Sequence, residues 1–220
     1  MGRSPYLAPD FYGKALAEGR HRAIVGGRWD ETGRAQMAAL TEVGGLAPHH
    51  HLLDIGAGAL RLGCKAVAYL APGHYWGTDA SRDLMLAGHA AELADPARLD
   101  PAQLIEDDAF AFPGVPEAIT HAIAFAVFPH LPNDCLGRAL TNLTRFPRLE
   151  VFLFTVFLAP EGQAAAPYRQ PDGVVTHPDR PPRHMLERDV LAAAAGWDLT
   201  KHDRMLPRGQ VLFEARKRPA

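Results

Sequence analysis

A glycine-rich turn at residues 56–63 is the segment of this sequence best suited to chemistry. The apolar run Leu52–Ile55 leads into Gly56-Ala57-Gly58, and a helix-like segment follows from Arg61. Glycine has no Cβ atom, so the backbone of such a turn can approach a ligand closely. Because the turn follows a strand, the ligand would lie at the carboxyl end of a parallel sheet, where α/β proteins bind nucleotides.

Two common nucleotide motifs fit this turn poorly. A dinucleotide fingerprint needs a third glycine three positions after Gly58, where this sequence has Arg61. A phosphate-binding loop has the required spacing between Gly58 and Gly63, but Cys64 occupies the position of its lysine. The sequence therefore disfavours both NAD and nucleoside triphosphates.

Acidic residues follow the next two candidate strands. Asp79 ends the run Tyr75–Asp79, about 20 residues after the glycine turn, where an acid commonly accepts hydrogen bonds from ribose hydroxyls. Asp107 and Asp108 follow the apolar run that begins at residue 103. Each feature alone is common, since an acid at a strand end also caps helices. Their order along one βαβαβ run favours a nucleoside ligand.

These three segments resemble the motifs of class I S-adenosylmethionine (SAM) methyltransferases. The segment 54–58 (DIGAG) resembles the first motif, 75–79 (YWGTD) the second and 106–110 (EDDAF) the third. The resemblance implies SAM as the cofactor, with Asp79 on the ribose and Asp108, or else Asp107, on the adenine amino group. The cofactor-binding residues that it implies are Asp54, Gly56, Ala57, Gly58, Arg61, Asp79, Ala80, Asp107, Asp108, Ala109, Phe125 and Trp29.

The chain is more closely similar to a bacterial subfamily of small methyltransferases whose substrates are mostly unknown. Shared stretches include 26–31 (GGRWDE), 127–132 (VFPHLP), 177–180 (HPDR) with His184, and 207–210 (PRGQ). This sequence departs from the subfamily at Ala57, where Cys is frequent, at Leu62, where Gly is, and at Pro129, where Thr is. The pair Phe125-Ala126 replaces a polar pair.

The elements that must position these residues alternate between strand and helix. Strands are predicted at 52–55, 75–79, 103–107, 119–125 and 149–157, and helices at 61–70, 82–93, 134–145 and 187–195. The runs 197–202 and 210–215 predict a terminal β-hairpin. We therefore expect an α/β fold: a Rossmann-like, mostly parallel methyltransferase sheet with an antiparallel C-terminal hairpin.

One domain over residues 1–220 is expected, with two special segments. Residues 1–48 predict a helical cap whose aromatics, Tyr6, Tyr12 and Trp29, either cover the sulfonium or pack the cap. Residues 158–184 form a proline-rich segment in which neither a helix nor a central strand is tolerated. Its place after the fifth strand suggests a lid over the substrate.

The candidates for direct chemistry lie after the fourth strand and in this lid. His130 follows the strand 119–125 and could take a proton from the substrate, although its apolar neighbours favour a packing role. The lid would act through Tyr168 and His184 as catalytic residues and through Arg169 and Arg180, with Tyr12 of the cap, as substrate-binding residues. A solvated loop is the alternative interpretation of the same residues.

Composition and charge limit the kinds of partner that this chain is expected to bind. A net charge of -2 provides no field for nucleic acid, and no apolar run approaches the roughly 20 residues that span a membrane. The segment His49-His50-His51 is not expected to bind a metal, because successive side chains of a strand point to opposite faces. Two cysteines, placed in helix-like segments, fit a reducing cytoplasm. A monomer and a homodimer are both compatible with the sequence.

The expected function is SAM-dependent transfer of a methyl group to an oxygen or nitrogen of a small molecule. Two alternatives remain. The apolar pair Phe125-Ala126 would suit a closed pocket in which SAM cyclises or is cleaved to methylthioadenosine without a second substrate. A chain that binds SAM without catalysis is the other.

Overall fold

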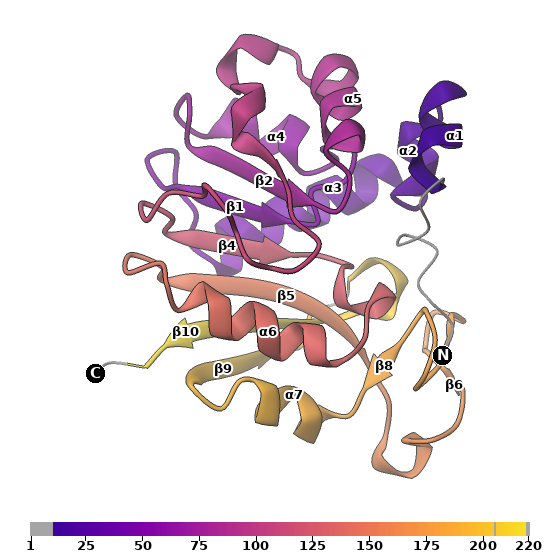
Figure 1. Cartoon of the computed structure of the whole chain (residues 1–220). Coiled ribbons are helices and arrows are strands. Elements are labelled where there is room, and N and C mark those ends of the chain that lie inside the picture. Colours follow the sequence, from indigo (N-terminus) through magenta and orange to yellow (C-terminus); the bar gives the residue numbers. More distant parts are fainter. Residues whose placement is uncertain (1–10, 205, 219–220) are drawn as a thin grey trace.

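A mixed β-sheet forms the centre of the computed structural model, which describes residues 11–204 and 206–218 (Figure 1). Its strand order is β3-β2-β1-β4-β5-β10-β9. Neighbours are parallel from β3 to β5, whereas β10 is antiparallel to both β5 and β9. The predicted α/β fold with an antiparallel C-terminal hairpin is confirmed. The strands are β1 (Leu52–Ile55), β2 (Tyr75–Asp79), β3 (Leu104–Glu106), β4 (His121–Ala124), β5 (Val151–Leu158), β9 (Trp197–His202) and β10 (Val211–Lys217).

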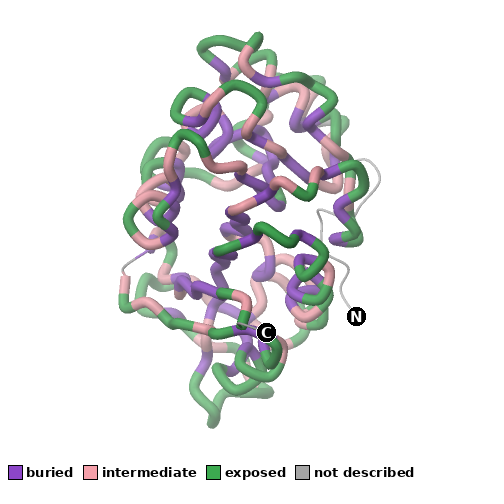
Figure 2. Tube along the Cα trace, turned by 90° about the vertical axis from the view of Figure 1, so that its left-hand side faces the viewer, coloured by how far each residue is buried: buried purple, intermediate pink, exposed green. Residues whose placement is uncertain are grey.

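Helices cover both faces of the sheet. On one face lie α6 (Asp134–Leu143) and α7 (Glu187–Ala193), and on the other η2 (Ala39–Val43), α4 (Gly63–Tyr69) and α5 (Arg82–Glu92). Alternation along β1 explains this arrangement, because Leu53 packs into the first core and Leu52 into the second. Buried residues accordingly follow the strands through the middle of the molecule (Figure 2).

Three short α-helices precede η2 in the described part of the N-terminal cap. They are α1 (Phe11–Ala17), α2 (His21–Ile24) and α3 (Trp29–Ala38), and α1 and α2 both contact α5. Ile24 and Ala15 pack with Ala59 of the glycine turn and Leu84 of α5 in a separate small core. The cap is therefore fastened next to the turn. Tyr6, predicted to contribute to this cap, lies outside the described residues.

The proline-rich segment contains more regular structure than its composition predicts. After the 3₁₀ turn Glu161–Gln163, the strands β6 (Tyr168–Arg169) and β7 (Val175–Thr176) form a small separate hairpin. The strand β8 (His184–Met185) then pairs in parallel with the end of β5. These pairings fit between the prolines because each strand has only two residues, so no proline interrupts a ladder.

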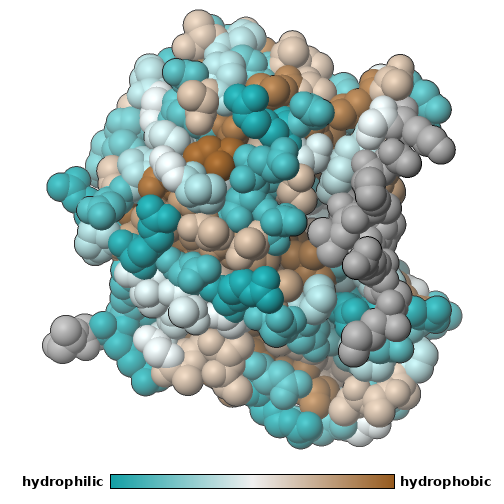
Figure 3. Space-filling view, viewed as in Figure 1, coloured by the Kyte–Doolittle hydropathy of each residue, from teal (hydrophilic) through white to brown (hydrophobic). Residues whose placement is uncertain are grey.

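Four further 3₁₀ turns lie in the described ranges. The 3₁₀ turns are Pro96–Arg98, Pro101–Gln103, η5 (Phe128–His130) and η7 (Pro207–Gly209). No helix in the described ranges has the length and apolar character needed to cross a bilayer. On the face seen in Figure 3, hydrophobic residues form small groups between polar ones.

Candidate functional site

The glycine turn is folded over the carboxyl end of β2. The backbone N–H groups of Gly56 and Ala57 donate to the carbonyl oxygen of Thr78 at 2.7 and 3.0 Å. Gly56 and Gly58 have φ angles of 72° and 55°, in the left-handed region that glycine adopts without strain. A Cβ atom on Gly58 would lie 2.6 Å from Cγ1 of Val25, so this glycine is also needed for the cap to dock.

Asp79 connects the turn to β2 directly. Its Oδ2 accepts a hydrogen bond of 2.9 Å from the N–H of Gly58, and its Oδ1 accepts one of 3.1 Å from the N–H of Ser81. Burial raises the pKa of the Asp79 carboxyl, and the amides of Ser81, Gly58 and Ala80 oppose that shift. The carboxylate is thus fixed in orientation.

A cavity of about 670 Å³ opens where β1, β2 and β4 end, at the point where the strand order reverses. Open α/β sheets bind their ligands at this switch point. Eleven of the residues proposed from the sequence line it: Tyr12, Gly56, Gly58, Arg61, Asp79, Ala80, Asp107, Asp108, Phe125, His130 and Arg180. Seven lie outside the lining: Trp29, Asp54, Ala57, Ala109, Tyr168, Arg169 and His184.

Asp54 faces away from the cavity, contrary to the sequence-based expectation. Its Oδ2 accepts a hydrogen bond of 2.7 Å from the phenol of Tyr75, and both side chains are buried. The reason is strand alternation: Asp54 shares a face of β1 with Leu52, which packs under the helices of the second core. Asp54 therefore lies on the side of β1 that packs into the second core, and it does not face the cavity.

Two adjacent carboxylates after β3 have different environments. Asp107 accepts hydrogen bonds from the N–H groups of Ala109, Ala111 and Phe112 at 2.7 to 3.1 Å, so both its oxygens hold the following turn. Asp108 is exposed at the cavity. This arrangement favours Asp108 as the ligand-binding acid of the pair. Ala109 serves the Asp107 turn and lies outside the lining.

Arg61 fastens the cap to the cavity wall. Its Nη1 donates to the carbonyl oxygen of Val25 at 2.8 Å, and its Nε donates to Oε1 of Gln36 at 3.3 Å. Trp29 begins α3 with the guanidinium of Arg22 at 5.0 Å from its ring, and it packs within the small cap core. Of the cap aromatics described, Tyr12 lines the cavity and Trp29 does not.

The segment after β4 carries His130. Burial, together with the positive charge of Arg208, lowers the pKa of His130 to about 4, so the imidazole is neutral near pH 7. A hydrogen-bonded chain holds this segment: the Thr155 hydroxyl donates to Oε1 of Gln210 at 2.6 Å and accepts from the N–H of Ala126 at 2.7 Å. His130 thus lies on a firmly held turn.

Part of the proline-rich segment lines the cavity. Val174, Arg180, Pro181 and Pro182 reach it, and the N–H of Arg183 donates to the carbonyl oxygen of Pro129 at 2.6 Å. His184 is buried in β8, where its Nδ1 is 2.9 Å from the Thr176 hydroxyl. Tyr168 and Arg169 form β6, on the outer hairpin. The pairing of β8 with β5 turns His184 inward, which its loop-like sequence did not indicate.

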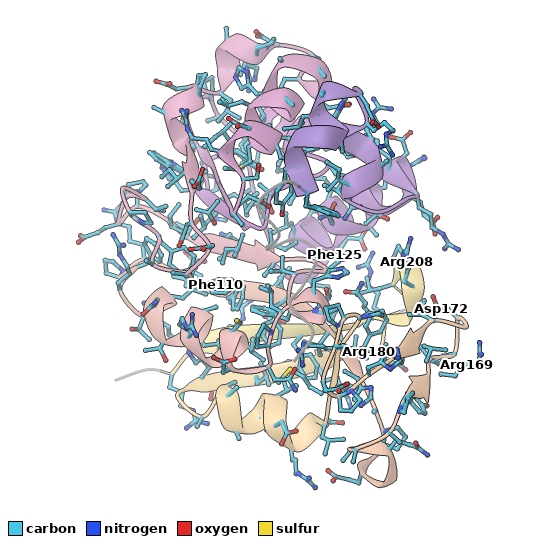
Figure 4. All side chains as sticks on the ribbon, turned by 45° about the vertical axis from the view of Figure 1, so that its right-hand side comes forward. Phe110, Phe125, Arg169, Asp172, Arg180 and Arg208 are labelled. Atoms are coloured by element: carbon cyan, nitrogen blue, oxygen red, sulfur yellow. The ribbon has the colours of Figure 1, made fainter. Side chains whose placement is uncertain are left out.

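Sequence reasoning gave no role to Arg208 and Gln210, which also line the cavity. Both belong to the turn between β9 and β10, and Figure 4 shows Arg208 on that turn, on the same side of the molecule as Arg180. The sequence offered one signal for Gln210, which is its position between a glycine and an apolar strand. The structure buries its side chain, and buried amides need hydrogen-bond partners, which Thr155 supplies.

The consecutive histidines lie near the amino ends of β1 and β4. The His50 ring stacks on His121 with centroids 4.4 Å apart, and the His51 ring stacks on His74 at 3.8 Å. Within the described ranges, no three His, Cys, Asp or Glu side chains are grouped to hold a metal ion.

Comparison with solved structures identifies the fold. The magnesium protoporphyrin IX methyltransferase ChlM of Synechocystis PCC 6803, with bound S-adenosylhomocysteine (SAH), matches 95% of this chain and 97% of its own at 13% identity and a TM-score of 0.58. The DhpI–SAH complex matches 94% of this chain and 97% of its own at 13% identity and a TM-score of 0.58. The glycopeptide N-methyltransferase MtfA matches 84% of this chain and 90% of its own at 16% identity and a TM-score of 0.60. No family model and no curated protein sequence matches. The chain has the class I methyltransferase fold.

Proposed function

We propose that the cavity binds SAM and that the chain transfers its methyl group to an oxygen or nitrogen of a small molecule. The observation that carries this proposal is the Asp79 carboxylate, which lines the cavity while its orientation is fixed by the amides of Gly58 and Ser81. A half-buried, oriented acceptor beside a glycine turn suits the two hydroxyls of a ribose.

The remaining lining fits the other parts of the cofactor. Asp108 follows the next strand and can accept from an adenine amino group, while Ile55, Leu84 and Phe110 provide apolar surface for a base. The solved structures of ChlM and DhpI with bound SAH, which share this fold, support the same assignment.

When bound, SAM supplies a methyl group on a sulfonium that is already activated for in-line displacement. The chain must therefore exclude water and align the acceptor, a contribution of roughly 7 to 11 kcal/mol to lowering the barrier. Phe125 and Leu131 supply apolar wall, and the neutral imidazole of His130 can take up the acceptor's proton. A dedicated base is optional for this chemistry.

A second candidate is cyclisation or cleavage of SAM to methylthioadenosine. It is favoured by Phe125 and Ala126, which present apolar surface at the cavity after β4. Against it, the cavity continues to the polar side chains of Arg180 and Arg208, which such a reaction would not need. The two free thiols, Cys64 and Cys135, support a reducing, cytoplasmic setting for either reaction.

Calorimetry with SAH and product analysis with SAM test these assignments. We expect SAH to bind with micromolar affinity, a range typical of metabolic enzymes. Incubation with SAM and a suitable acceptor should release SAH, whereas methylthioadenosine from SAM alone would establish the second candidate. Binding without either product would establish a non-catalytic SAM-binding protein. Folded protein that does not bind SAH at millimolar concentration would refute the whole proposal.

A further inference from the structure

Apart from Arg61, whose guanidinium is bonded to Gln36 and Val25 beside the glycine turn, the charged side chains that line the cavity are divided between two sides. The carboxylates of Asp79 and Asp108 follow β2 and β3, at the side assigned to the nucleoside. The guanidinium groups of Arg180 and Arg208 belong to the segment before β8 and to the turn before β10. A ligand that spans the cavity would therefore meet acceptors at one end and cationic donors at the other.

These two arginines differ from most others in the chain. Arg22, Arg188 and Arg204 form ion pairs with glutamates. Arg98 and Arg145 donate to backbone carbonyl groups. Across residues 11–204 and 206–218, by contrast, neither Arg180 nor Arg208 pairs with a carboxylate or donates a hydrogen bond. Their donors are available to a ligand.

Arg208 has a backbone conformation that is unfavourable in free energy for a residue with a side chain. Its φ angle of 66° lies in the left-handed region, which costs a non-glycine residue roughly 1 to 2 kcal/mol. The turn around it is closed by the N–H of Gly209, which donates to the Leu206 carbonyl at 3.1 Å, and a Cβ atom on Gly209 would lie 3.3 Å from Oδ1 of Asp172. Strained residues that persist in this way cluster at ligand sites.

Arg208 reaches towards the cap across the cavity. Its Nη2 is 4.0 Å from the point where a Cβ atom on Gly26 would lie. Its charge also acts on His130, whose pKa it lowers. Arg208 is thus close to both the cap and the turn that carries His130.

Arg180 approaches the same region from the proline-rich segment. The N–H of Arg183, three residues later, is bonded to the carbonyl oxygen of Pro129, next to His130. In Figure 4, Arg180 and Arg208 lie on the same side of the molecule, and Arg169 lies farther out. Pro181 and Pro182 follow Arg180 in the chain and Pro207 precedes Arg208, and the cavity lining also includes the apolar residues Leu131, Phe157 and Val174.

We propose that the methyl acceptor is a small organic anion with an apolar body, and that Arg180 and Arg208 together bind its oxyanion group, a carboxylate or a phosphate. This inference rests on the proposed function, since it assigns to the methyl acceptor the part of the cavity that SAM would not occupy. Guanidinium groups are the side chains best matched to planar carboxylate and phosphate oxygens. The anion would direct the remainder of the acceptor along the apolar wall towards His130.

Binding of simple probes to the SAH-saturated protein tests the proposal without turnover. Benzoate should bind with a Kd on the order of millimolar, and neutral benzamide at least about tenfold more weakly. Arg180→Gln and Arg208→Gln should each weaken benzoate binding by about tenfold, the effect expected for loss of one charge-assisted hydrogen bond. Arg208→Lys should retain part of the affinity. Phenyl phosphate, titrated in parallel, shows which oxyanion is preferred.

Arg138→Gln is the matched control, because Arg138 is an exposed arginine of α6 paired with Asp134. It should leave benzoate binding unchanged. A second readout is the pKa of His130 by NMR, which should rise in Arg208→Gln, since this variant removes the nearby positive charge. Arg208→Lys should leave it near the wild-type value.

The possible failures are distinct from one another. If SAH does not bind, the proposed function fails. If SAH binds but neither anion binds at millimolar concentration, or benzamide binds as well as benzoate, the acceptor inference is overturned. It is also overturned if the arginine variants lose SAH affinity and keep benzoate affinity, because the pair would then hold the cofactor's own carboxylate.

Discussion

The Tyr75 phenol donates a hydrogen bond of 2.7 Å to the Asp54 carboxyl within the core behind the glycine turn. Burial raises the pKa of Asp54 from its ordinary 3.8 to about 7, although the Tyr75 bond opposes this shift. The folded chain therefore binds a proton that the unfolded chain releases between these two values. By linkage, this group stabilises the fold below its ordinary pKa, and its contribution is lost as the pH rises through about 7.

Tyr75→Phe should destabilise the fold most at alkaline pH. It removes the donor to Asp54, and an unsatisfied buried acceptor costs about 1 to 3 kcal/mol. Because the lost bond favours the ionised carboxylate, the pKa of Asp54 should rise further, and the loss should be larger at about pH 8 than at about pH 5.5. Urea unfolding at both pH values measures this. Tyr69→Phe, which removes the bond from a partly exposed phenol to the Leu46 carbonyl, is the control. An equal, pH-independent loss in both variants would contradict the prediction.

Asp79→Asn should weaken SAH binding by about 1 to 3 kcal/mol, as expected when ribose hydroxyls lose a charged acceptor. Asparagine keeps one oxygen for the amide of Gly58, so the turn should survive better than in Asp79→Ala. Calorimetry gives the affinity. Asp83→Asn, at an exposed acid in the first turn of α5, should change nothing. Unaltered affinity in Asp79→Asn would mean that Asp79 only holds the turn.

Gly88→Ala and Gly137→Ala should have opposite effects, although both glycines lie inside helices. A Cβ atom on Gly88 would lie 2.3 Å from the backbone oxygen of Ala59, which the glycine turn holds in place. At Gly137 of α6 no atom lies within 4 Å of that point. We expect Gly88→Ala to cost about 1 to 3 kcal/mol or more, and Gly137→Ala to stabilise by up to about 1 kcal/mol. Chemical unfolding measures both. Equal effects would show that α5 can move away from the turn.

His121→Gln should flatten the acid side of the stability profile. Burial lowers the pKa of His121 from 6.5 to about 4, although the hydrogen bond of 3.0 Å between its Nε2 and the Gly44 carbonyl opposes this shift. A depressed pKa means that the neutral form stabilises the fold above 6.5 and that this contribution is lost as the pH falls towards 4. Urea unfolding across this interval should show a smaller slope in the variant than in the wild type. An unchanged slope would assign acid sensitivity to other groups.

The sequence determined the order and type of the main elements. The bounds of β1, β2 and β9 were predicted to the residue, because short apolar runs between glycines, prolines and polar residues delimit them sharply. Gly58 and Asp79 could be chosen as site residues since the ends of adjacent parallel strands must meet at one edge of the sheet. Strand periodicity would also have turned Asp54 away from that edge.

Only the tertiary structure decided how distant segments complete the cavity. Asp54 accepts its hydrogen bond from Tyr75 on the neighbouring strand. His184 is buried because β8 pairs with β5. Arg208 reached the cavity because β10 folds back beside β5, which brings the turn before it to the edge where β1 and β4 end. Local sequence carries propensities for strands and turns, whereas which turns meet depends on strand order and register, and these are set by packing of the whole sheet.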